Sequence, residues 1–343
     1  MGNTPNFWKT SLEDIDETIN SLKKGKIVGM ARSAGERPIY AVFYGEENNL
    51  GRTANLSSAL GAGERACYAD KNSSLYRPTV FLVGCIHGGE FEGTAALMNL
   101  INLFEKGKDL KGERNSFLLN ALKRVNFLII PCVNPDGRNR VPFDTMVGHT
   151  LDELRYYNQG TWKDGSLCGY PECKKVHPIK DACEFLGAYF NDDGVNLMHD
   201  DFFRTKSSEN DFLFDVVDKY CPDFTILLHG GTNTSPLIFK PTYSPTPVKE
   251  RLRVFENNLK LRYEHEGMRY CITPMDGGEN NEAPASFNLP SALYQLCGEP
   301  CITYESNQGL TDDVGRGMTH EEIYKGHIIL FEEAIKFIEE RRS

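Results

Sequence analysis

The chain has 343 residues, of which 40% are hydrophobic and 25% are charged. This composition supports a sizeable apolar core and excludes collagen-like and low-complexity chains. The 38 lysine and arginine residues and the 48 aspartate and glutamate residues give a formal net charge of −10 at pH 7. An acidic chain is poorly suited to holding a phosphate backbone, so we expect no nucleic-acid partner.

The first predicted elements are a helix and a pair of strands. Apolar residues recur at helical spacing from Leu12 to Leu22, and Lys23-Lys24-Gly25 supplies the cations and the glycine that are typical of a helix end. Residues 27–31 and 38–44 then predict two strands around a turn-rich hairpin tip.

The central part of the chain predicts two buried strands separated by a helix. Residues 79–86 and 125–131 are continuous apolar runs, which favour strands that are covered on both faces. A helical pattern occupies about residues 90–106 between them. Residues 138–195 are irregular and rich in Gly, Pro, Cys and Asp, which predicts a long and functional loop region.

The last third of the chain predicts two more strands, at 224–228 and 301–304. Helical patterns lie near 248–265 and at 321–340. Strands that alternate with helices favour an α/β fold, in which a mixed, mostly parallel sheet is covered by helices on both faces.

The N-terminal segment and the cysteines bear on location. The N-terminus lacks the apolar stretch of a secretory signal, and the longest apolar run, about 125–133, is too short to span a bilayer. We therefore expect a cytoplasmic protein with no membrane partner and reduced thiols. Cys168 and Cys173 lack the spacing of a zinc motif and predict loop thiols or one local disulfide. Cys297 and Cys301 predict buried thiols.

Four predicted strands run into polar residues. The strand at 79–86 leads into His87-Gly-Gly-Glu90, and the strand at 125–131 precedes Asn134-Pro-Asp-Gly137. The two later strands are followed by His229 and Glu305. Because ligands of open α/β sheets bind at the carboxyl ends of the strands, we expect these side chains to meet at one edge.

The residue types at this edge point to zinc chemistry. Two imidazoles and one carboxylate leave a fourth coordination position for water, as in several metallopeptidases. His87 and Glu90 are three residues apart, and the two glycines between them permit a tight turn that lets both side chains reach one ion. A further glutamate at a strand end can act as the general base.

The ordered motifs give the chain a resemblance to zinc carboxypeptidases of the carboxypeptidase A/B type, over about residues 10–340. The motifs that carry it are Ser33-Ala-Gly-Glu-Arg-Pro-Ile39, His87-Gly-Gly-Glu90, Asn134-Pro-Asp-Gly137, Gly194-Val-Asn-Leu197, His229 after a buried strand, and Thr303-Tyr-Glu305.

The resemblance implies a fold and a reaction. It implies a single α/β domain over residues 1–343, with a mixed, mostly parallel twisted sheet of about eight strands and with 138–195 as a loop-rich insertion. One zinc ion would be held by His87, Glu90 and His229. Glu305 would be the general base in hydrolysis of an amide bond and would later protonate the leaving amine.

The chain departs from the family pattern where that family binds the terminal carboxylate of its substrate. Met198 and His199 stand at the positions of the usual Asn-Arg pair, and Gly89 replaces an arginine of the first motif. A protonated His199 could bind a carboxylate weakly near pH 6. Arg138 and Arg140 are further candidates for a relocated carboxylate clamp.

Two other family positions have only approximate equivalents. Lys163 aligns with the catalytic arginine that assists the oxyanion, and Arg155 competes for that role. Tyr270 is the candidate by order for the tyrosine that caps the substrate. These departures predict that the zinc machinery is kept while recognition of a free C-terminal carboxylate is altered.

The leading interpretation is a zinc-dependent metallopeptidase of carboxypeptidase type that acts on a peptide or an N-acyl amino acid. One alternative is a zinc-dependent deacylase or amidase of the aspartoacylase or succinylglutamate desuccinylase type. Another is a zinc-binding pseudoenzyme that serves as a binding module. The presence of Glu305 argues against the pseudoenzyme, because the general base is what such a protein would lose.

Overall fold

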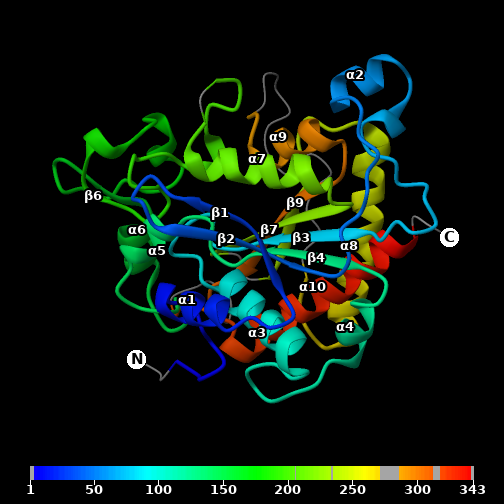
Figure 1. Ribbon diagram of the computed structural model, residues 1–343. Helices are drawn as coiled ribbons and strands as arrows, with labels where there is room; N and C mark the ends of the chain where they lie inside the picture. Colours follow the sequence, from blue (N-terminus) through cyan, green and yellow to red (C-terminus); the bar gives the residue numbers. More distant parts are fainter. Residues whose placement is uncertain (1–3, 205, 233–234, 271–285, 312–316, 341–343) are drawn as a thin grey trace.

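The structure is a computed structural model (Figure 1), and it describes residues 4–204, 206–232, 235–270, 286–311 and 317–340. The described residues form one α/β domain around a seven-stranded mixed sheet with the order β1-β2-β4-β3-β7-β9-β8. The predicted fold class is therefore confirmed, but the main sheet has seven strands in the described part of the chain instead of about eight. A separate two-stranded sheet pairs β5 with β6.

The centre of the main sheet is parallel and its margins are antiparallel. β4, β3, β7 and β9 run side by side in the same direction, whereas β2 and β8 run against their neighbours. Every residue of β3 and β4 is buried, which is why both strands read as continuous apolar runs in the sequence. The strands are β1 (Lys26–Arg32), β2 (Pro38–Tyr44), β3 (Thr79–Val83), β4 (Asn126–Ile130), β7 (Phe224–Gly231), β8 (Leu237–Phe239) and β9 (Cys301–Asn307).

Helices cover both faces of the sheet and bury alternate residues of its strands (Figure 1). One face packs on α1 (Leu12–Asn20), α3 (Glu92–Lys106), α4 (Ser116–Ala121), α8 (Thr246–His265) and α10 (His320–Glu340). The other face packs on α2 (Leu56–Gly61), α7 (Ser208–Tyr220) and α9 (Leu289–Cys297). None of the helices in the described ranges is both long enough and apolar enough to cross a bilayer.

The segment 138–195 is more regular than its composition predicts. It contains α6 (Leu151–Gln159), whose first turn has a capping box between Thr150 and Glu153. It also contains the strands β5 (Gly160–Trp162) and β6 (Cys183–Leu186). A small apolar cluster, which includes Cys168, Cys173, Ile179 and Phe190, gives the segment its own core. The expectation of an irregular loop throughout was therefore wrong, because this core orders the chain.

The cysteines in the described residues are free thiols. The Sγ atoms of Cys168 and Cys183 are 4.0 Å apart, about twice the length of a disulfide bond. Cys297 and Cys301 are buried, as their sequence context predicts.

A buried ion-pair cluster lies beside the strand ends opposite the polar motifs. The Asp223 carboxylate accepts hydrogen bonds from the Tyr76 hydroxyl at 2.5 Å and from the Thr79 backbone N–H at 2.8 Å. It also pairs with the Lys71 ammonium at 3.1 Å, and Lys71 contacts Glu299 at the same distance. This cluster therefore ties the start of β3 to the start of β7.

Replacing Asp223 with alanine is expected to destabilise the protein by about 3–5 kcal/mol, because the buried Lys71 ammonium and the Tyr76 hydroxyl lose a partner. Denaturant unfolding measures this loss. Glu250→Ala, which breaks an exposed pair with Arg253 at 3.2 Å, should leave the unfolding midpoint almost unchanged. Equal midpoints for Asp223→Ala and the native protein would show that the cluster does not stabilise the fold.

Candidate metal centre and catalytic cavity

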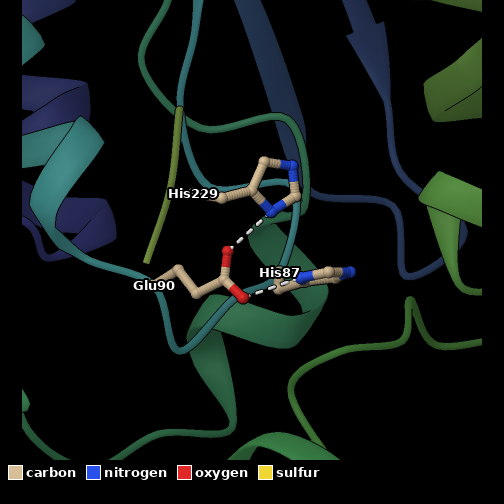
Figure 2. Close-up of side chains that lie close together, drawn as sticks. All are labelled: His87, Glu90 and His229. Atoms are coloured by element: carbon tan, nitrogen blue, oxygen red, sulfur yellow. Dashed lines mark hydrogen bonds and ion pairs between the residues drawn. The ribbon is translucent and has the colours of Figure 1, made fainter. Parts of the chain in front are cut away.

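Three buried side chains, two from the loop between β3 and α3 and one from β7, converge on one point (Figure 2). His87 follows β3, Glu90 lies just before α3, and His229 is on β7. The possible ligand atoms of these residues all lie within 4.8 Å of one another. Glu90 is placed between the imidazoles, with its Oε1 2.7 Å from Nδ1 of His87 and its Oε2 2.8 Å from Nδ1 of His229.

The donor set fits a zinc ion. Neither ring nitrogen of His229 has a hydrogen-bond partner among the described residues, since the approach of Nδ1 to Glu90 lacks the geometry of a hydrogen bond. A buried ring nitrogen without a hydrogen-bond partner, such as Nε2, is costly unless it binds something else. Two nitrogens and a carboxylate in contact also match the ligand types of catalytic zinc sites, with an open position for water.

The protonation states of Glu90 and His87 suit metal binding. Burial by itself raises the pKa of Glu90, but the two neighbouring histidines outweigh it and lower that pKa to about 2, so the carboxylate is ionised. Burial lowers the pKa of His87 despite the opposing effect of Glu90, which favours the neutral imidazole that a metal requires.

Close packing explains the two glycines of the His87-Gly-Gly-Glu90 turn. A Cβ atom on Gly88 would lie 2.0 Å from the backbone carbon of Gly137, so the turn presses directly on the Asn134-Pro-Asp-Gly137 motif. A Cβ atom on Gly89 would lie 1.7 Å from Oδ1 of Asn158. A side chain at position 89 would therefore require the Asn158 side chain to move.

The Asn134-Pro-Asp-Gly137 motif supports this turn. The Asn134 side chain accepts a hydrogen bond from the Gly137 N–H at 2.9 Å and donates one to the Ile86 carbonyl at 3.1 Å. These bonds connect the short helix α5 (Pro135–Asn139) to the residue just before His87. The motif therefore supports the backbone just before His87, and its own residues do not line the cavity.

Two residues that hold His87 in place were not assigned by sequence reasoning. Oδ1 of Asn196 lies 3.2 Å from Nε2 of His87, so it can accept the proton of that nitrogen and leave Nδ1 free for a metal. The Tyr189 ring stacks on the imidazole with centroids 3.9 Å apart and an interplanar angle of 24°. Asn196 lies in the Gly194-Val-Asn-Leu197 motif, so the motif carried a signal for it.

Replacing Asn196 with alanine is expected to weaken zinc binding by about 10- to 100-fold, because the His87 ring loses the acceptor that sets its orientation and tautomer. Competition with a chromophoric chelator measures the affinity. Asn196→Asp keeps an acceptor oxygen and should bind zinc at least as tightly as the native protein. An alanine variant with native affinity would exclude this orienting role.

Glu305 lies across from the ligands on β9. The pairing of β7 with β9 places Glu305 directly opposite His229. Burial raises the pKa of Glu305 to about 7, with His229 opposing and Glu90 adding to the shift. A carboxyl group with a pKa near neutrality is well matched to proton transfer in either direction at that pH.

Glu305 and the two histidines open onto a cavity of about 400 Å³. Of the predicted site residues, His199 and Arg155 also line it. Further lining groups are Gln159, Lys174, Tyr189, Asn196, Lys240 and Gln308. The side chain of Gln159 is buried, and its Oε1 has no hydrogen-bond partner in the described residues, which leaves an acceptor for a ligand.

Besides the ligand candidate Glu90, four predicted site residues do not line this cavity. Arg138 donates to the backbone carbonyls of Thr10 and Val141, and Arg140 donates to those of Gly187 and Phe190. Both arginines also pair with aspartates, so protein groups occupy their guanidinium ends and they hold loops together instead of forming a clamp at the cavity.

Lys163 and Tyr270 lie elsewhere as well. Lys163 is an exposed residue after β5, and the Tyr270 ring packs against Tyr263 at a centroid distance of 5.3 Å. His199 does line the cavity, but burial and the nearby positive charge of Lys174 lower its pKa to about 3. A pKa this low favours a neutral His199 near pH 6 and argues against a protonated carboxylate ligand at that position.

Comparisons with known proteins bear on the family and the fold of the chain. Residues 15–161 match the family model described as zinc carboxypeptidase. A search of curated proteins found no matching sequence. The solved structures with a similar fold include a metallo-carboxypeptidase from Burkholderia cenocepacia, with 14% identity and a TM-score of 0.60, over 95% of this chain and 68% of that one.

Two more solved structures have the same fold at equally low identity. A metallo-carboxypeptidase from Pseudomonas aeruginosa, in complex with (2-guanidinoethylmercapto)succinic acid, has 14% identity and a TM-score of 0.58, over 96% of this chain and 68% of that one. Carboxypeptidase A from Helicoverpa armigera has 14% identity and a TM-score of 0.56, over 99% and 76%. The chain thus matches the zinc carboxypeptidase family over residues 15–161 and has the fold of the metallocarboxypeptidases over almost its whole length, which confirms the resemblance of its motifs.

Proposed function

We propose that this protein is a zinc-dependent hydrolase of carboxypeptidase type that cleaves an amide bond. His87, Glu90 and His229 hold one zinc ion, and Glu305 is the general base. The observation that carries the proposal is the convergence of the three ligand side chains within 4.8 Å, with Glu305 opposite His229 at the wall of the same cavity.

The zinc ion and the protein side chains have different roles in the proposed reaction. When bound, zinc polarises a carbonyl group and makes water a better nucleophile near neutral pH. The Glu305 carboxylate accepts a proton from the attacking water and donates it to the nitrogen of the leaving amine, so that an acid and an amine are released. Asn196 and Tyr189 keep the His87 ring in position throughout.

The cavity suits a small substrate such as a peptide end or an N-acyl amino acid. Its volume of about 400 Å³ lies within the range of small-molecule sites. Apolar lining from Leu151, Leu154 and Phe239 can receive a side chain, and Gln159 offers an acceptor for an amide N–H.

The test is metal-dependent hydrolysis by the 343-residue chain. We expect one zinc per chain by atomic absorption, and hydrolysis of a panel of N-acyl dipeptides and N-acyl amino acids that stops after chelation and returns with added zinc. Bound zinc without hydrolysis of any panel member would favour a binding module. Full activity in the metal-free protein would exclude the zinc mechanism.

A further inference from the structure

The two residues that hold the His87 ring belong to one loop, residues 187–196. Tyr189 stacks on the imidazole, and Oδ1 of Asn196 lies 3.2 Å from its Nε2. The loop contains no helix or strand, so no ladder of backbone hydrogen bonds of its own fixes its path. Contacts from other parts of the chain must therefore decide where both side chains meet His87.

The Arg140 guanidinium fastens this loop on both sides of Tyr189. One of its terminal nitrogens donates to the carbonyls of Gly187 at 2.7 Å and of Phe190 at 2.8 Å. The other donates to the Asp192 carboxylate at 2.8 Å. A planar guanidinium suits this task because it presents several donors in fixed directions. A single side chain thus fixes three points of the loop, and Tyr189 lies between two of them.

Asp192 connects the loop to the hairpin tip between β1 and β2. Its second oxygen accepts a hydrogen bond from Arg37 at 2.7 Å, and Arg37 also binds the buried Asp136 carboxylate at 2.8 Å. Burial by itself raises the pKa of Asp192, but Arg140 and Arg37 outweigh it and lower that pKa, so the carboxylate is ionised near neutral pH. Asp136 in turn accepts the Asp192 backbone N–H at 3.0 Å. The loop is therefore tied to two other segments through one aspartate.

The loop also touches the ligand turn directly through its backbone. The Ala188 carbonyl accepts a hydrogen bond from the Gly88 N–H at 2.7 Å, next to His87 in the chain. Together with Tyr189 and Asn196, this bond gives the loop three contacts with the His87 turn. A displacement of the loop would therefore move or release the imidazole.

We propose that the Arg140–Asp192 pair positions the loop 187–196 against His87 and thereby sets the zinc affinity of the site. Neither residue of the pair lines the cavity. They are positioning residues, because they act through Tyr189 and Asn196. The inference rests on the proposed function, since it concerns the same zinc ion.

Zinc affinity, measured by competition with a chromophoric chelator, tests the proposal. We expect Arg140→Gln and Asp192→Asn each to weaken zinc binding by about 10-fold, the lower end of the range for groups that orient a ligand directly. The effect should be at this lower end because Tyr189 and Asn196 are still present and are only less well placed. Asp192→Asn has nearly the shape of the native side chain, so it tests the pair even if Arg140→Gln folds poorly.

Arg138→Gln is the matched control. Arg138 also donates to two backbone carbonyls and to an aspartate, but its partners are Thr10, Val141 and Asp144, which lie outside the loop. The substitution should lower the midpoint of denaturant unfolding of the metal-free protein and leave the zinc affinity unchanged. An arginine that only stabilises the fold is thereby separated from one that positions a ligand.

A double-mutant cycle tests whether Arg140 acts through the two residues that contact His87. In a background that carries both Tyr189→Ala and Asn196→Ala, Arg140→Gln should have little further effect on zinc affinity, because the contacts that it positions are already missing. The visible spectrum of the cobalt(II)-substituted protein gives a second readout. It should change in Arg140→Gln and stay native in Arg138→Gln.

The outcomes distinguish this inference from the proposed function. Native zinc affinity in both Arg140→Gln and Asp192→Asn, or an undiminished effect of Arg140→Gln in the background without Tyr189 and Asn196, overturns the positioning role and leaves the zinc site intact. An equal loss of affinity in Arg138→Gln also overturns it, because the effect would then be a general loosening of the fold. A native protein that binds no zinc would overturn the proposed function and this inference together.

Discussion

Glu305→Gln is expected to lower kcat/KM for amide hydrolysis by about 10²- to 10⁴-fold, which is the usual contribution of a general base. The amide of glutamine has nearly the shape of the carboxylate but cannot accept a proton from water. The side chain is half-buried at the cavity wall, at the strand position paired with His229, and no other carboxylate of the described residues lines that cavity to replace it as a base. Zinc content should stay at one per chain, since Glu305 is not a ligand in the proposed site.

Two measurements check this expectation. Initial rates on the best panel substrate give kcat/KM, and atomic absorption gives the metal content of the same sample. Glu184→Gln, at an exposed position on β6, makes the same chemical change away from the cavity and should keep native activity. Native rates in Glu305→Gln with zinc still bound would remove Glu305 from the mechanism.

His229→Ala is expected to abolish stoichiometric zinc binding and, with it, hydrolysis. The substitution removes one of the three proposed protein ligands. Loss of an outer hydrogen-bond partner of a ligand lowers metal affinity by about 10- to 100-fold, so loss of the ligand itself should lower zinc affinity by more than about 100-fold. It also leaves the buried Glu90 with His87 as its one remaining imidazole partner among the described residues. The thermal stabilisation that zinc gives the native protein should disappear as well.

Zinc titrations monitored by calorimetry and by thermal unfolding measure both effects. His265→Ala, at a position 79% exposed near the end of α8, removes a histidine without touching the site and should bind zinc normally. A His229→Ala protein that still takes up one zinc with native affinity would show that the ion binds elsewhere in the chain.

The sequence predicts the centre of the fold better than its covering layer. β3 and β4 are fully buried, so their apolar runs are unambiguous, and the long helix α10 has a continuous apolar stripe. The helices α2, α4 and α9 escaped prediction because they are only six to nine residues long. Helices of this length depend on packing against the sheet more than on their own propensity.

In the candidate site, too, some residues could be predicted from the sequence and others could not. His87, Glu90, His229 and Glu305 could be predicted because each follows or ends a buried strand, and the rule for parallel strands places such residues at one edge. Lys174 could not be predicted in this way. It lies in a 3-10 helix, Glu172–Lys175, inside a segment whose path is set by its own small core and by β5 and β6.

Arginines show most clearly what a sequence leaves open. Three arginines with the same charge lie within residues 138–155. The guanidinium groups of Arg138 and Arg140 bind backbone carbonyls and aspartates, whereas Arg155 lines the cavity. An arginine side chain is long enough to reach many partners, so its position in the sequence does not predict which group it contacts.

Composition and pattern by themselves determined an acidic α/β protein with a zinc-type donor set at one edge of a parallel sheet. Strand burial shows in short-range hydrophobic patterns, which is why it can be predicted from the residues alone, whereas the strand order comes from the structure. Tertiary structure decided which cations face the ligand, which residues orient His87, and that the segment 138–195 forms a wall of the cavity. Those features depend on contacts between residues far apart in the chain, which no local pattern records. The net charge of −10 likewise did not indicate that three cationic side chains line the cavity.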